Sequence, residues 1–90
     1  MGDMATDRDR LLEGIEHARA GRWDEAHAIA QSLEGDPQAD WLHAILHKIE
    51  GDASNSRYWY SRSAHSYESF ADSCAELDAL AREIAPRDRA

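Results

Sequence analysis

The segment WLHAILHKIEGD, residues 41–52, decides the fold because it carries the clearest helical pattern in the chain. Asp36 and Pro37 precede it as a favourable N-cap and a favourable first helical residue. Gly51 follows it as a residue able to adopt the left-handed conformation that ends many helices. Apolar residues recur between these ends at helical spacing: Trp41, Leu42, Ile45, Leu46 and Ile49. The segment therefore predicts a central helix with one apolar stripe.

The opposite face of this helix holds Asp40, His43, His47 and Glu50. Residues three and four apart lie on neighbouring turns of one helix face, so these side chains can interact with one another. Two interpretations of this arrangement remain open. In the first, these side chains form a polar face, or the histidines are hydrogen-bonded between two packed helices. In the second, His43 and His47 bind a divalent metal such as zinc, with Glu50 as a third ligand and His27 as a further one. The glutamate of an H-E-x-x-H zinc protease motif is absent, because Ala44 follows His43.

The rest of the chain predicts an all-α fold of about five helices, with no strand-like alternation. Thr6 or Asp7 can begin a first helix, and Trp23 to Leu33 form a second one. Asp52 begins a fourth helix, and Ser69 begins a last helix that ends before Pro86. We expect residues 1–6 to be disordered, residues 7–85 to form one helical domain, and residues 86–90 to be a loose tail.

Composition narrows the possible partners. The 90 residues carry a formal net charge of −8, which argues against binding to nucleic acids and to anionic membrane surfaces. The single cysteine, Cys74, fits a reducing, cytoplasmic setting, and its place on an apolar stripe predicts a buried thiol. No apolar run approaches the length of a membrane span, and the start of the chain lacks the hydrophobic region of a signal peptide.

The fourth predicted helix contains three consecutive aromatic residues, Tyr58, Trp59 and Tyr60, next to Arg57. Three consecutive side chains cover more than half a helix turn, so at least one of them must meet another element, a partner or solvent. Aromatic residues with nearby arginines are frequent in protein interfaces. We therefore expect an interaction surface made of Trp41, Arg57, Tyr58, Trp59 and Tyr60; a helix packed on two sides is the alternative.

One helical hairpin resembles the tetratricopeptide repeat. The resemblance rests on Gly21, Trp23, Ala26 and the pair Asp36-Pro37, whose spacing is close to that of the family. A second unit begins thirty residues later at Gly51 and matches less well, because Ala53 and Ser56 replace the aromatic residue and the alanine. The string WLHAILHKIEGD, with the SNSRYWY that follows shortly after it, is also similar to a string in small hypothetical proteins of unassigned function.

The resemblance covers roughly residues 7–65 and implies two antiparallel helical hairpins followed by a capping helix. In tetratricopeptide domains the first helices of the hairpins line a groove that receives peptides. Aligned on Gly51, His43 and His47 fall at positions that pack against the following helix, where burial would keep them neutral. Two repeats are fewer than such folds usually need, so the resemblance predicts a homodimer or a complex with another protein.

The sequence contains no nucleophile–base set and no phosphate-binding glycine cluster. The first functional hypothesis is therefore a noncatalytic protein-interaction module that associates with itself and needs no cofactor. The alternative is a metal-binding or metal-dependent protein that uses His43, His47 and Glu50.

Overall fold

The computed structural model describes residues 6–84, which form five α-helices and one short 3-10 helix and contain no strand. The elements in chain order are α1 (Asp7–Arg19), α2 (Trp23–Ser32), α3 (Pro37–Glu50), α4 (Ala53–Tyr60), η1 (Tyr67–Ser69) and α5 (Ser73–Ile84). The all-α prediction is confirmed. The expectations for residues 1–5 and 85–90 lie outside the described residues. None of the described helices is long and apolar enough to cross a membrane.

Local capping sequences set most of the helix ends. Thr6 and Asp9 form a reciprocal capping box at the start of α1. The Asp36 side chain accepts a hydrogen bond of 2.9 Å from the backbone N–H of Gln38 at the start of α3. Gly51 ends α3 with a φ of 91°, a backbone conformation that favours glycine. The predicted bounds of the central helix are therefore confirmed.

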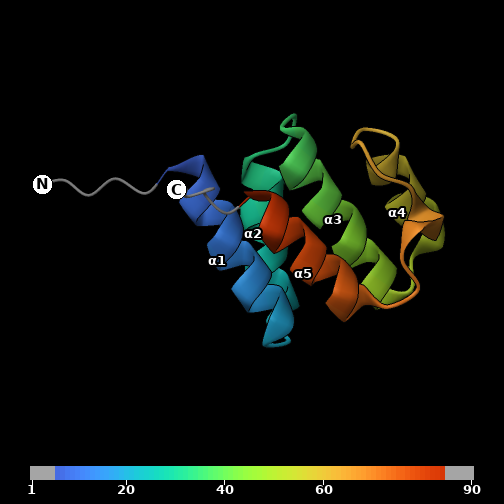
Figure 1. The fold of residues 1–90 in the computed structure, drawn as a ribbon, viewed down its shortest axis with the longest axis horizontal. Coiled ribbons are helices and arrows are strands. Elements are labelled where there is room, and N and C mark those ends of the chain that lie inside the picture. Colours follow the sequence, from blue (N-terminus) through green and yellow to red (C-terminus); the bar gives the residue numbers. More distant parts are fainter. Residues whose placement is uncertain (1–5, 85–90) are drawn as a thin grey trace, which may run out of the picture.

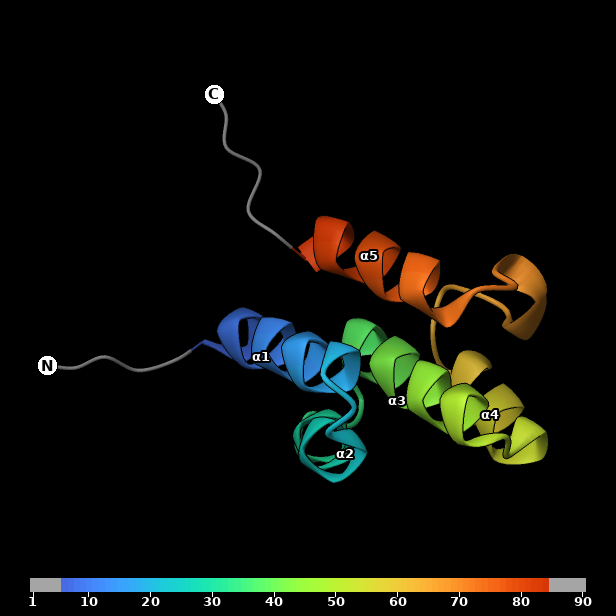
Figure 2. The ribbon, with the colours of Figure 1, turned by 90° about the horizontal axis from the view of Figure 1, so that it is seen from below.

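Short turns join α1 to α2 and α3 to α4, so each pair forms a helical hairpin (Figure 1). The last helix, α5, packs across α1 and α3, on the side of this pair opposite α2 (Figure 2). Helix α5 thus covers the face formed by α1 and α3, the first helices of the two hairpins.

Helix α3 is the centre of the fold, because each of the other four α-helices packs against it. Every residue from Ala39 to His47 is buried, including Asp40 and the two histidines. The face that carries Asp40, His43 and His47 is therefore enclosed by other helices. The largest fully enclosed apolar side chains of the core are Leu11, Ile15, Trp41, Leu42, Ile45, Leu46 and Leu80.

The start of the last helix differs from the prediction. Ser69 ends the 3-10 helix, and the Asp72 side chain takes over the cap by accepting a hydrogen bond from the backbone N–H of Ala75. Cys74, predicted to be buried, is exposed. The reason is its place in the first turn of α5, at the edge of an open groove that it lines together with Ala18 and Ile49.

Candidate metal centre

Three imidazole rings from two helices converge in the interior. His27 projects from α2, while His43 and His47 lie one turn apart on α3. The ring centroids are separated by 4.7 Å for His27 and His43, 5.3 Å for His27 and His47, and 5.0 Å for His43 and His47. One potential ligand atom from each ring lies within 4.8 Å of the other two. The three rings thus surround a single point.

Small residues allow α2 to approach α3 closely enough for this contact. Ala26 and Ala30 on α2 and Ala39 on α3 are completely buried. Side chains this short let two helix backbones come near each other, so His27 reaches across the interface. The i,i+4 spacing of His43 and His47 places both rings on the side of α3 that α2 covers.

Two tryptophan rings hold two of the imidazoles in place. Trp59 of α4 stacks on His43 with a centroid distance of 3.9 Å and an interplanar angle of 12°. Trp23 stacks on His27 at 4.6 Å, also with an angle of 12°. The Trp23 Nε1–H donates a 2.7 Å hydrogen bond to the backbone carbonyl of Leu46, which fixes this indole relative to α3. The ring planes of His27 and His43 are therefore set by packing.

Glu50 orients the third imidazole. Its Oε2 lies 2.7 Å from Nδ1 of His47. Because a carboxylate can only accept, this contact places the proton of a neutral His47 on Nδ1 and leaves a lone pair on Nε2. Carboxylates commonly hold metal-binding histidines in this way from outside the ligand set. Glu50, predicted as a third ligand, is hydrogen-bonded to His47, and His27, predicted as a further ligand, completes the group of three imidazoles.

His43 is the unusual member of the cluster. Its side chain is 3% exposed, and its Nδ1 atom is buried without a hydrogen-bond partner. An unsatisfied buried polar atom destabilises the folded state by about 1–3 kcal/mol. We expected the buried histidines to be neutral and paired; the structure pairs His47 and leaves this nitrogen of His43 unpaired.

Burial and mutual proximity favour the neutral form of His27 and His43. Burial, followed by smaller contributions from the neighbouring His27 and His47, lowers the pKa of His43 to about 4. Burial also lowers the pKa of His27, with a smaller contribution from His47; Glu50 and Asp24 oppose this shift. Because metal ligands must be deprotonated, the lowered pKa values of His27 and His43 favour metal binding by these two rings.

A second group of possible ligands shares His47. It consists of His47, Glu50 and Asp52, with one ligand atom from each within 4.8 Å of the others. Glu50 and Asp52 are both exposed, and the Asp52 carboxylate also accepts a 3.3 Å hydrogen bond from the backbone N–H of Asn55 at the start of α4. This outer group therefore places negative charge beside the three-histidine cluster.

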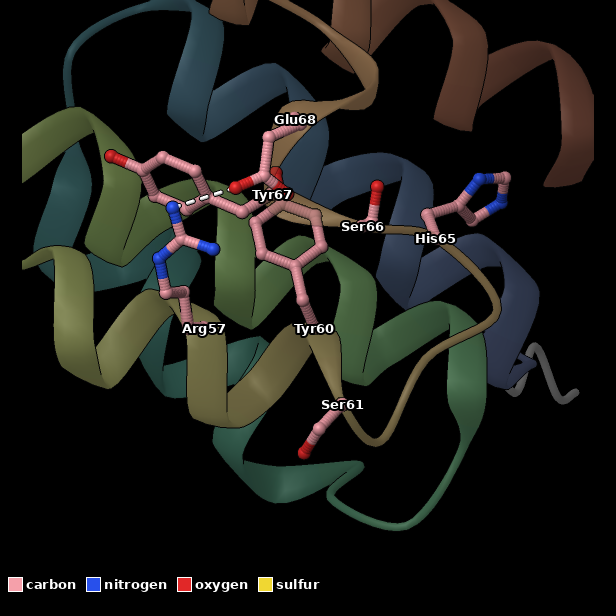
Figure 3. Close-up of a pocket in the computed structure, with 7 residues that line it drawn as sticks. All are labelled: Arg57, Tyr60, Ser61, His65, Ser66, Tyr67 and Glu68. Atoms are coloured by element: carbon pink, nitrogen blue, oxygen red, sulfur yellow. Dashed lines mark ion pairs between the residues drawn. The ribbon is translucent and has the colours of Figure 1, made fainter.

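The residues predicted as an interaction surface are divided by the structure. Trp41, Trp59 and Tyr60 are buried, whereas Tyr58 is 52% exposed and Arg57 is also exposed. Tyr58 is thus the member of the aromatic triplet that meets solvent. The Arg57 guanidinium lies 4.2 Å from the centroid of the Tyr67 ring and 2.7 Å from a carboxylate oxygen of Glu68. Figure 3 shows this ion pair at a shallow pocket that Tyr60 and His65 also line.

A buried carboxylate explains why Trp41 and Tyr60 are inside. Glu76 of α5 is completely buried and accepts hydrogen bonds from Trp41 Nε1 at 2.8 Å, Tyr60 Oη at 2.5 Å and Lys48 Nζ at 3.0 Å. Burial, followed by the hydrogen bond to Glu76, raises the pKa of Tyr60. Sequence reasoning missed Glu76, although its place one residue before Leu77 on the buried stripe of α5 was a possible signal.

Comparisons with protein families, with curated proteins and with solved structures find no match to this chain.

Proposed function

We propose that this small helical protein binds one divalent transition-metal ion between His27, His43 and His47. The observation that carries the proposal is the convergence of three imidazoles, one of which has a buried nitrogen without a partner. A metal ion bound through this nitrogen would satisfy it. Imidazole donors suit zinc, copper, nickel and iron, whereas magnesium and calcium prefer oxygen ligands.

The required movement of the rings is small. Zinc–nitrogen bonds of about 2.0 Å in a tetrahedral arrangement place the ligand nitrogens about 3.3 Å apart. The candidate atoms lie within 4.8 Å of one another, so they need to approach by at most about 1.5 Å. His27 is the most exposed of the three and therefore the ring best able to move. Glu50 already fixes His47, so its Nε2 remains available to the ion.

Isothermal titration of the protein with zinc, without a histidine tag, tests the proposal. We expect one ion per chain in the parent protein and no specific binding in His27→Ala, whose partly exposed side chain can be removed with little loss of folding. His17→Ala is the matched control, since His17 lies outside the cluster and pairs with Arg22. Equal binding by the two variants, or no binding by the parent, would refute the proposed site.

Self-association is a second candidate function. It is supported by the exposure of Tyr58, which stands between Arg57 and Arg62 on the outer side of α4. An exposed tyrosine flanked by arginines is a composition that protein interfaces favour. Light scattering at micromolar concentration tests it: we expect a dimer that Tyr58→Ser weakens. A parent protein that stays monomeric at these concentrations would exclude self-association through α4.

A further inference from the structure

The three histidines leave part of the coordination sphere of a bound ion to other ligands. Among residues 6–84, no further histidine, cysteine or carboxylate places a ligand atom within 4.8 Å of the ligand atoms of all three residues His27, His43 and His47. Glu50 lies on the Nδ1 side of His47, where it makes its 2.7 Å hydrogen bond. Structural zinc sites are closed by four protein ligands, whereas sites with three protein ligands accept water or substrate as the fourth.

The coordination position that the three histidines leave free would face solvent on one side only. His43 is covered by Trp59, and His43 and His47 are 3% and 7% exposed. His27 is the only member of the cluster that is partly exposed. An ion held between the three rings would therefore meet solvent past His27, and a small molecule would reach it from that side.

The charge around this opening is negative. The Asp24 and Glu50 carboxylates are close enough to His27 for their charges to act on its ring. Fixed negative charge at the mouth of a cleft attracts cations and repels anions. The opening thus favours entry of the metal ion itself, and it weakens the binding of small anions relative to water.

Resting on the proposed metal site, we infer that the bound ion keeps one coordination position for an exogenous small ligand, with water as the resting occupant. A metal-bound water in such a position is acidified and is the reactive group of many hydrolytic zinc sites. A site with an open coordination position differs from a purely structural metal site, in which the ion only links α2 to α3.

Cobalt(II) makes this position visible, because its d–d absorption reports coordination number. Protein loaded with one equivalent of cobalt(II) is titrated with sodium azide, and separately with imidazole as a neutral probe. We expect a saturable spectral change with one ligand per ion. In Asp24→Asn we expect azide to bind about two- to threefold more tightly, because one negative charge at the opening is removed, while imidazole affinity stays unchanged.

The outcomes separate the two proposals. If cobalt binds but neither azide nor imidazole alters its spectrum, the coordination sphere is closed, and this inference is wrong while the metal site stands. If neither cobalt nor zinc binds, both proposals fail together. His27→Ala serves as the control for surface-bound cobalt: an azide response that persists there would place the responding ion outside the cluster and overturn the inference.

Discussion

Replacement of Glu76 by alanine is expected to lower the free energy of unfolding by about 3 kcal/mol. The Glu76 carboxylate accepts hydrogen bonds from Trp41, Tyr60 and Lys48, and it forms an ion pair with the Lys48 ammonium, which lies 3.0 Å away. Removing it takes away the acceptor of the Trp41 Nε1–H and of the Tyr60 hydroxyl, and it removes the charge that pairs with Lys48. The Lys48 side chain is 11% exposed, so the remaining charge is only partly reached by water.

The magnitude follows from these contacts. Removing one partner of a buried ion pair usually costs about 3–5 kcal/mol. The lower end applies because the Lys48 Nζ keeps two other acceptors, the Phe70 carbonyl at 2.9 Å and the Tyr60 hydroxyl at 3.2 Å. Glu76→Gln retains an acceptor oxygen but not the charge, so we expect roughly half of the loss.

Urea unfolding followed by circular dichroism measures the effect, with the midpoint and slope reported separately. Asp78→Asn is a matched control on the same helix, because Asp78 pairs with Arg19 at the surface with a side chain that is 54% exposed. Exposed pairs contribute at most about 1 kcal/mol. If Glu76→Ala were no more destabilising than Asp78→Asn, the buried network would not hold α5 in place, and the reasoning would be refuted.

Three further predictions concern the cluster and the core. Burial lowers the pKa of folded His43 to about 4, below the unfolded value of about 6.5. The contribution of His43 to the stability of the metal-free protein should therefore be complete above pH 6.5 and decrease as the pH falls towards 4. In urea unfolding, His43→Phe should flatten this pH profile. Copper(II) should quench tryptophan fluorescence, since Trp23 and Trp59 stack on ligand candidates, and Trp59→Phe should remove much of the quenching. Gly14→Ala should lower the thermal midpoint despite the higher helix propensity of alanine, because the new Cβ would lie 3.0 Å from the buried Leu42 side chain, and overpacking costs about 1–3 kcal/mol.

Local signals made the helices predictable. The cap at Asp36, the proline after it and the glycine at position 51 act within a few residues, so they set the ends of α3 whatever packs against it. The last helix was harder, because Ser69 and Asp72 are both good caps and the choice between them depends on tertiary contacts.

The site was only partly predictable. The spacing of His43 and His47 showed that their rings share a helix face, but the role of Glu50 depends on which side of His47 it approaches. Trp41 was predicted to be on a surface and is buried. Its Nε1 finds an acceptor in Glu76, 35 residues further along the chain, and no local pattern shows such a partner.

The position of α5 has a consequence for the order of folding. Helices α1 to α4 pack mainly against their neighbours in sequence, so they can form while closing only short loops. Helix α5 must return across α1 and α3, and its docking transfers Glu76 from water into the interior. Contacts of this kind form late, so changes at Glu76 should mainly accelerate unfolding and leave the refolding rate almost constant. Amide protons of α5 should then exchange with solvent sooner than those of α3, since α5 can detach while both hairpins remain folded.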